Sequence, residues 1–277
     1  MAEERLPGAV TSELMNRIEE SAVSAAREIL SGRRIIDVEG PYGVALTTVE
    51  VGNDDRCREP GPEKASAVVS RALSVPMIYR RFVISKRRIA AFQETGQPLN
   101  LKVAEDAAQA VAAREEEFIY QGQREFHLGG LLTVEGRQNV KAGNWDNVDE
   151  VLGDVITAVN VLDGKGYRGP YGLALAPELY NSLFRRYAGS DLLQIEHLKR
   201  LCTRGIVKAA IAGCVLVARD VGSIVLGQDL QVGHLTSDAA HENFAVSESL
   251  ILKIEAPDAI CTIMSESGRA SRQRAQR

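Results

Sequence analysis

The sequence lacks the features that mark disulfide-rich, secreted and membrane-spanning proteins. Its four cysteines lie far apart and form no CxxC pair, which argues against a thiol metal site and a disulfide framework. Residues 1–14 contain no apolar core of a classical signal peptide. No apolar run approaches the roughly 20 residues that a membrane-spanning helix needs. We therefore expect a cytoplasmic protein in which Cys214 and Cys261 are buried, reduced thiols.

The familiar catalytic and nucleotide-binding motifs are also absent. There is no Walker A sequence, no GxSxG elbow and no HExxH, and the four histidines show no metal-ligand spacing. Gly164, Gly166 and Gly169 match GxGxxG, but a predicted helix precedes them and a strand follows, the reverse of a dinucleotide site. The glutamates at 115–117 point in different directions around a predicted helix, which favours a solvated face over a metal or acid site. The sequence thus predicts no enzyme, with no catalytic residues, no metal site and no cofactor.

The charge balance excludes another class of function. A formal net charge of -4 argues against sequence-independent binding to nucleic acid, which needs a positive field. The 45% hydrophobic content supports a sizeable core, and with aromatics at 5% that core must consist mainly of aliphatic side chains. Residues 265–277 contain hardly any apolar side chains and are expected to form a disordered, solubilising tail.

Apolar periodicity predicts a mixed α+β chain. Helices are predicted over 11–31, 86–95, 102–121 and 148–163, from Pro177 onward, and over 191–204. Strand-like runs occupy 33–39, 44–51, 68–75, 77–85, 171–176, 206–209, 214–218, 223–227, 229–235, 244–255 and 259–264. The polar stretch 52–64 joins two of these runs, so that 44–75 is expected to project from the body as an oversized hairpin.

Four sequence blocks carry a family resemblance. GRRIIDVEGPYG (32–43), GPYGLALAPELY (169–180), VLGQDLQVGH (225–234) and SLILKIEAPDAICTI (249–263) resemble segments of encapsulin shell proteins, in the same order and spacing. The resemblance extends from about residue 10 to 264. It implies an α+β phage-capsid-type fold, shared with the major capsid proteins of tailed phages, with a peripheral domain, an axial domain and an extended loop.

The resemblance also implies how the chain is divided. The ranges are an N-terminal lumen-facing helix and the start of the peripheral domain (1–43), the extended loop (44–75), the peripheral domain with its spine helix (76–130), the axial domain (131–225), a return to the peripheral domain (226–264) and the tail (265–277). Such a chain is expected to be a structural subunit that assembles into a closed, icosahedral homo-oligomer around cargo enzymes.

The cargo site is likewise implied by the resemblance. A groove on the inner wall is expected to bind a C-terminal peptide of the cargo, with Arg33 and Asp37 orienting the peptide. The matching positions are Ile29, Arg33, Ile35, Asp37, Val38, Leu230 and Val232. The alternative is that the apolar members belong to the core and that the arginine and aspartate form a local pair. The five-fold pore is expected at Tyr187, Ala188, Gly189, Ser190 and Asp191.

The prediction of the cargo rests on the resemblance of the segment near the end of the sequence. PDAICTI resembles shells that house ferritin-like iron-storage cargo, and a dye-decolorising peroxidase is the alternative. Some shells bind a flavin near a tryptophan, but Arg88 occupies the approximate position here and the only tryptophan is Trp145, so no flavin is expected. A viral major capsid protein, or the bacteriocin or protease labels sometimes given to this family, are further alternatives.

Overall fold

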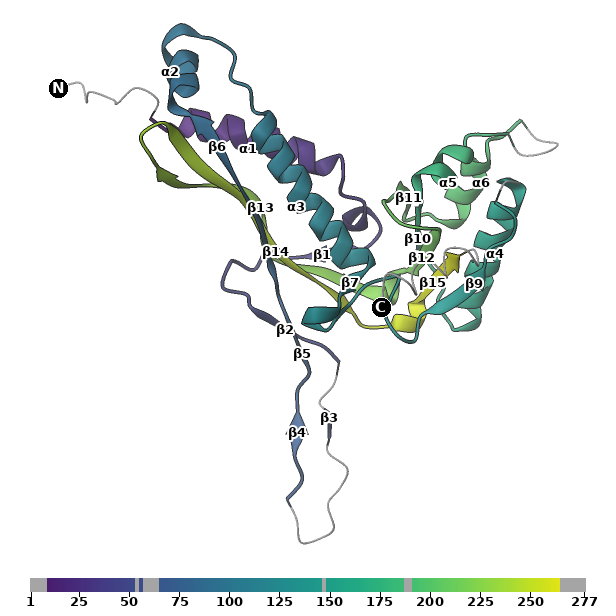
Figure 1. Cartoon of the computed structure of the whole chain (residues 1–277). Coiled ribbons are helices and arrows are strands. Elements are labelled where there is room, and N and C mark those ends of the chain that lie inside the picture. Colours follow the sequence, from purple (N-terminus) through teal and green to yellow (C-terminus); the bar gives the residue numbers. More distant parts are fainter. Residues whose placement is uncertain (1–8, 53–54, 57–64, 146–147, 187–190, 265–277) are drawn as a thin grey trace.

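The computed structural model describes residues 9–52, 55–56, 65–145, 148–186 and 191–264. The chain forms two bodies and a narrow projecting arm (Figure 1). One body is built on a four-stranded sheet and the other on a five-stranded sheet. We refer to them as the four-stranded body and the five-stranded body. No helix within these ranges combines the length and apolar character of a membrane span.

The four-stranded body packs two helices against one face of its sheet. The strand order is β1 (Asp37–Glu39), β13 (Gly222–Ser237), β14 (His241–Ile254) and β6 (Met77–Ser85), with β1 and β13 parallel and the other pairs antiparallel. The helices α1 (Ser12–Arg27) and α3 (Lys102–Tyr120) contact each other and this sheet (Figure 1). In β6 the buried side chains Ile78, Phe82 and Ile84 alternate with exposed Met77, Tyr79 and Val83. The alternation leaves the second face of β6 exposed within the described chain.

Helix α1 begins as predicted but ends four residues early. The hydroxyl of Thr11 caps it by accepting a hydrogen bond from the Leu14 amide at 3.2 Å. Its buried residues recur at helical spacing: Leu14, Ile18, Ala22, Ala25 and Ala26. After Arg27 the chain turns into the short 3₁₀ helix η1 (Gly32–Arg34), and only 37–39 of the predicted strand 33–39 forms. The segment turns here because its backbone amides bind α3 instead of continuing α1.

The five-stranded body has the order β11 (Gly205–Lys208), β10 (Tyr171–Leu175), β12 (Cys214–Ala218), β15 (Ile260–Met264) and β9 (Gln138–Lys141). Its helices are α4 (Val148–Gly164), α5 (Pro177–Ser182) and α6 (Gln194–Leu201). Every residue of β10 and β12 is buried. The predicted range 226–264 therefore runs across both sheets, because β15 pairs with β12 and β9.

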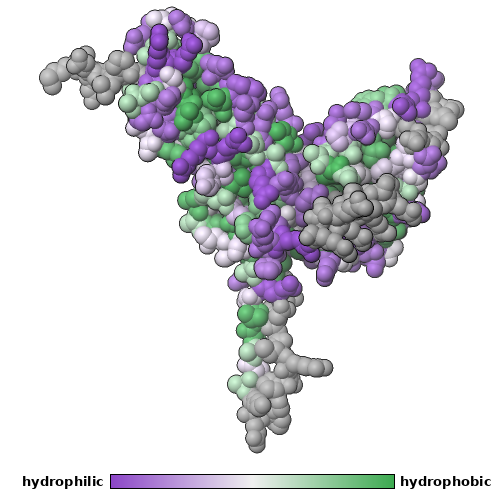
Figure 2. Space-filling view, in the orientation of Figure 1, coloured by the Kyte–Doolittle hydropathy of each residue, from purple (hydrophilic) through white to green (hydrophobic). Residues whose placement is uncertain are grey.

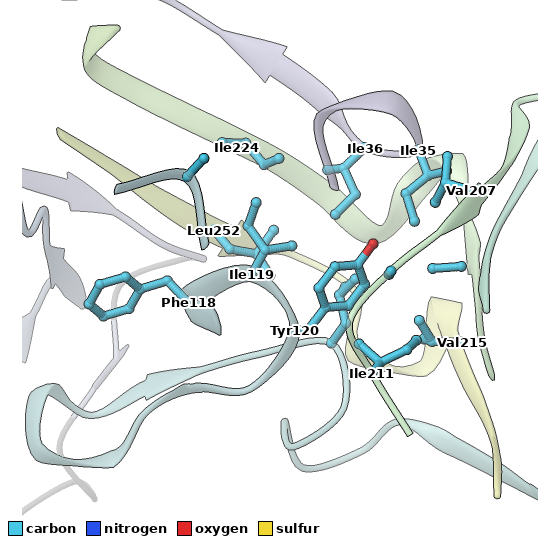
Figure 3. Packing of buried hydrophobic residues seen from close by; sticks show 14 of the residues in the cluster. Ile35, Ile36, Phe118, Ile119, Tyr120, Val207, Ile211, Val215, Ile224 and Leu252 are labelled. Carbon is cyan, nitrogen blue, oxygen red and sulfur yellow. The ribbon is translucent and has the colours of Figure 1, made fainter. Parts of the chain in front are cut away.

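The two bodies share one hydrophobic core. Figure 3 shows Ile35 and Ile36, from the segment after η1, near Ile119 and Tyr120 of α3 and near Val207 of β11. Ile35 packs closely on β10. A Cβ atom added to Gly172 of that strand would lie 2.7 Å from the Cβ atom of Ile35. The thiols of Cys202, Cys214 and Cys261 are buried and free, which confirms the prediction for Cys214 and Cys261. Burial raises the pKa of Cys202 and of Cys261 to about 12.

The arm is a two-stranded ribbon. Its strands are β2 (Thr48–Glu50), β3 (Asp55–Arg56), β4 (Val68–Val69) and β5 (Ala72–Ser74), paired as β2 with β5 and β3 with β4. Val68 is 53% exposed and Val69 is 63% exposed. Figure 2 shows hydrophobic surface on this narrow projection. A two-stranded ribbon cannot bury both of its faces by itself, so the arm needs a further surface to cover these side chains.

Several other predicted boundaries shift for identifiable reasons. The strands predicted at 223–227 and 229–235 form the single strand β13, because the irregularities near Gln228 are bulges within a continuous ladder. Val103 of α3 and Ile156 of α4 are exposed, although both are apolar. The remaining elements are α2 (Lys86–Thr95), η2 (Arg124–Phe126), η3 (Arg219–Val221), η4 (Pro257–Ala259), β7 (Gly122–Gln123) and β8 (Leu128–Gly129).

The core of the four-stranded body can be tested at Phe244. Its ring is fully buried and stacks on Phe82, with ring centroids 5.3 Å apart. We expect Phe244→Ala to lower the free energy of unfolding by about 3–5 kcal/mol, because it leaves a cavity between β14 and β6. The exposed Tyr79→Ala on the same sheet is the control and should change it by less than about 0.5 kcal/mol. Equal midpoints of thermal unfolding for the two variants at one protein concentration would contradict this packing.

Candidate functional site

Two buried glutamates of the described structure, Glu115 and Glu248, lie around one arginine. Arg33, in η1, donates two hydrogen bonds to Glu115 of α3, from Nε to Oε1 at 2.7 Å and from Nη2 to Oε2 at 2.7 Å. Its Nη2 also donates to Oε2 of Glu248 in β14 at 3.0 Å. Its Nη1 donates to Oδ1 of Asp229 in β13 at 2.6 Å. One guanidinium therefore joins four elements of the four-stranded body. We call these four residues the Arg33 cluster.

The members of the Arg33 cluster differ in their contact with water. The carboxyl groups of Glu115 and Glu248 are fully buried, whereas the side chain of Asp229 is 57% exposed. Burial and the neighbouring Glu115 carboxylate together raise the pKa of Glu248 well above its ordinary value. The carboxylates around Arg33 raise the pKa of its guanidinium despite its burial, so Arg33 stays charged.

A third buried glutamate, Glu116, holds the backbone of the same segment. Oε1 of Glu116 accepts hydrogen bonds from the amides of Ser31 at 2.9 Å and Gly32 at 3.0 Å. The Ser31 hydroxyl bonds to the Glu116 carboxylate and lies 2.8 Å from the hydroxyl of Tyr120. A Cβ at Gly32 would lie 2.8 Å from Cδ1 of Ile119, so only glycine lets the chain approach α3 this closely. Burial raises the pKa of Glu116.

The prediction of a solvated face for residues 115–117 is wrong at two of its three positions. Glu115 and Glu116 are buried, and only Glu117 is exposed, where it pairs with Arg114. The signal was present in the spacing, because Glu115 and Glu116 lie three and four residues after buried Ala112 and continue its helix face. Helix periodicity gives the face but cannot identify the arginine that pairs with it. No group of three His, Cys, Asp or Glu residues in the described ranges is arranged to hold a metal ion.

The structure separates the predicted groove residues into different environments. Ile29 and Leu230 are half-buried against the core, Val232 is buried and Val38 is 42% exposed. Ile35 is fully buried between the bodies, where the core already occupies its surface. Arg33 and Asp37 do not form a local pair, because Arg33 binds the cluster and Asp37 Oδ1 accepts from Arg204 Nη2 at 2.5 Å.

The predicted pore segment is described only at its end. Tyr187, Ala188, Gly189 and Ser190 lie outside the described residues. Asp191 is exposed, and its Oδ1 lies 3.8 Å from Nη1 of Arg186. Both residues lie within the connection between α5 and α6, at the far end of the five-stranded body (Figure 1).

The Arg33 cluster can be tested with a matched pair of neighbours. Arg33→Met removes the counter-charge and hydrogen-bond donor of the buried carboxyl groups of Glu115 and Glu248, and should lower the free energy of unfolding by about 3–5 kcal/mol. Arg34→Met removes the same charge from an exposed position and should cost less than about 0.5 kcal/mol. Arg33→Lys should fall between them, because an ammonium cannot reproduce the two-pronged contact with Glu115. Similar thermal unfolding of all three variants would show that the cluster does not stabilise the protein.

Comparisons with solved structures identify the type of fold. The virus-like particle from Pyrococcus furiosus superimposes with a TM-score of 0.71 at 23% sequence identity, covering 91% of this chain and 99% of that one. The capsid of Myoviridae phage XM1 gives a TM-score of 0.58 at 13% identity and covers 95% of this chain and 96% of that one. Both likenesses confirm the predicted α+β phage-capsid-type fold.

Comparisons with known sequences identify the protein family. The Linocin_M18 model, described as encapsulating protein for peroxidase, matches residues 4–251. The type 1 encapsulin shell protein EncA of Myxococcus xanthus is 31% identical over 261 residues, which are 89% of this chain and 91% of that protein. A ferritin-like-encapsulin shell fusion protein of Pyrococcus furiosus is 27% identical over 162 residues, which are 56% of this chain and 46% of that protein. The family model matches most of the chain, and the similarity to EncA covers most of both proteins. The chain therefore belongs to the encapsulin shell-protein family.

Proposed function

We propose that this shell subunit assembles into a closed icosahedral compartment, located in the cytoplasm, that encloses cargo enzymes. The observation that carries the proposal is the arm, an apolar two-stranded ribbon that projects from a capsid-type fold (Figures 1 and 2). A neighbouring subunit supplies the surface that the arm lacks, so burial of the arm and assembly are one event. Repeated heterologous contacts of this kind close into a shell. The domain ranges drawn from the resemblance are part of the same proposal.

Assembly should depend on the apolar side chains of the arm. We expect the wild-type protein to elute as a large particle at micromolar concentration. Val69→Asp should elute as a monomer or small oligomer, because it places a charge in the contact that covers the exposed valine. Ser66→Asp adds the same charge at an exposed polar position of the arm and should assemble normally. Size-exclusion chromatography with light scattering measures both. A wild-type protein that remains monomeric refutes the shell.

The inner wall is proposed to bind a C-terminal peptide of the cargo. Half-buried Ile29 and Leu230 and partly exposed Val38 provide apolar surface for Leu, Ile or Val side chains of such a peptide. Arg33 is fully engaged by carboxyl groups, so its role there is to fix the wall rather than to bind the peptide directly. Ile35 is excluded from direct contact by its complete burial.

Two leucines of β13 test the groove. Leu230→Asp should reduce cargo loading at least tenfold, because a carboxylate in an apolar trough loses its hydration without gaining a partner. Leu235→Asp changes an exposed leucine on the same strand and should load cargo like the wild type. The ratio of cargo to shell in purified particles, measured by densitometry, gives the result. Normal loading of the Leu230→Asp shell would remove Leu230 from the binding surface.

We propose a ferritin-like iron-storage enzyme as the cargo, supported by the similarity to the ferritin-like-encapsulin fusion protein of Pyrococcus furiosus. The description of the family model as encapsulating protein for peroxidase favours a dye-decolorising peroxidase as the second candidate. Co-expression with each enzyme, with and without its C-terminal peptide, separates them. The ferritin-like cargo is supported if it alone loads and if loading requires its peptide.

Small molecules are proposed to reach the cargo through openings between the five-stranded bodies, with Asp191 beside the five-fold opening. Nucleic acid is not a proposed partner, since the net charge of -4 opposes binding to a phosphate backbone. The membership of the encapsulin family and this charge favour an enzyme compartment over a viral capsid.

A further inference from the structure

We infer that Glu248 is a positioning residue that holds Arg33, and with it the wall of the proposed cargo groove, only while its carboxyl group carries a proton. The groove wall should therefore loosen as the solution becomes alkaline. The link to cargo rests on the proposed function, whereas the proton on Glu248 does not.

The hydrogen bonds identify which carboxyl group carries the proton. Glu115 receives two charge-assisted hydrogen bonds from Arg33, the arrangement that best stabilises a carboxylate. Glu248 receives one, at Oε2, and its buried Oε1 has no hydrogen-bond partner. An ionised carboxylate with one bare oxygen in the core is costly, whereas a protonated one can donate toward the Glu115 carboxylate beside it. The geometry thus assigns the proton to Glu248.

The charge count leads to the same assignment. Three carboxyl groups, from α3, β13 and β14, face one guanidinium from η1. The cross-strand neighbour of Glu248 in β6 is Ile78, which brings no charge. If all three were ionised, the cluster would hold two uncompensated negative charges. Protonation of Glu248 leaves one, and Asp229 can share that charge with solvent because its side chain is exposed.

The cluster joins the two segments that carry the proposed groove residues, because Arg33 lies in the segment after α1 and Asp229 lies in β13. Gln228 pairs with Ser249 and Gln231 pairs with Ser247, so Asp229 and Leu230 form a bulge opposite Glu248. Leu230 supplies one side of the groove from this bulge. On the other side, Arg33 follows Ile29 by four residues in the segment that Glu116 holds against α3. Ionised Glu248 would repel both Glu115 and Asp229 and so displace the bulge from the segment.

The direction of the pH effect follows from the raised pKa of Glu248. The pKa of Glu248 is raised from its ordinary value of 4.5 to about 9 when the wall is in place. The closed wall therefore binds one proton more than the open wall between these two values. The stabilisation is complete below about pH 4.5 and is lost above about pH 9. Between these values the equilibrium constant for closing the wall falls about tenfold for each pH unit.

Glu248→Gln is the central variant, because an uncharged amide imitates the protonated carboxyl group at every pH. Glu117→Gln, which removes an exposed carboxylate from α3, is the matched control. Infrared spectroscopy of assembled wild-type shells should show the carbonyl band of a protonated carboxyl group at pH 7.5. The band should disappear as the pH rises through about 9, and should be missing from Glu248→Gln but present in Glu117→Gln.

The consequence for binding is measured on cargo-free shells with a fluorescent copy of the cargo's C-terminal peptide. Wild-type and Glu117→Gln shells should lose affinity as the pH rises toward about 9, by up to about tenfold per pH unit. Glu248→Gln shells should keep their affinity to pH 10 within about twofold. Hydrogen exchange of residues 31–34, corrected for intrinsic rates, should lose protection in the same pH range in the wild type only.

The outcomes separate the two claims. If the peptide binds no shell at any pH while the infrared band and the exchange behave as expected, the cargo groove is wrong and the positioning role of Glu248 stands. If wild type and Glu248→Gln share the same infrared band, exchange and pH profile, the inference about Glu248 is overturned, whatever the peptide does.

Discussion

The contact between Arg33 and the buried carboxyl groups of Glu115 and Glu248 is the constraint on which the arrangement of this subunit depends. It ties the segment after the N-terminal helix to the spine helix and to the two long strands of the sheet. Glu116 adds two backbone hydrogen bonds to the same segment, and Gly32 allows the close approach. Ile35, two residues after Arg33, then enters the core shared by both bodies (Figure 3).

A buried charge cluster is a weak source of net stability, because desolvation offsets most of the attraction between the charges. Its value here lies in its specificity. Apolar side chains alone would let the segment slide along α3, whereas a planar guanidinium with defined partners fixes both position and direction. The cluster thereby fixes the segment that follows Ile29 relative to the bulge of β13 that contains Leu230. Precise placement matters in a shell, since each copy must present the same inner wall and the same arm to its neighbours.

Much of the fold could be predicted from local pattern. The apolar periodicity of α1 and α3, the strand-like run of β6 and the long polar stretch within the arm indicated these elements close to their observed bounds. The boundaries that moved depend on distant partners: α1 ends at Arg27 because Glu116 takes the amides of Ser31 and Gly32. Periodicity alone indicated only a mixed protein with a projecting hairpin, and the four family blocks were needed for the capsid-type fold.

The site was less predictable for the same reason. Sequence spacing placed Glu115 and Glu116 on a helix but could not show that Arg33 lies across from them, 82 residues away in the case of Glu115. The alternative of a local pair between Arg33 and Asp37 is not found, because Arg204 of the other body binds Asp37. A cryo-electron microscopy map of the assembled particle tests the account most directly. It should show hollow particles with α1 on the inner surface and continuous density from Arg33 to both Glu115 and Glu248. Particles with α1 on the outer surface, or with the Arg33 side chain directed away from these two glutamates, would contradict it.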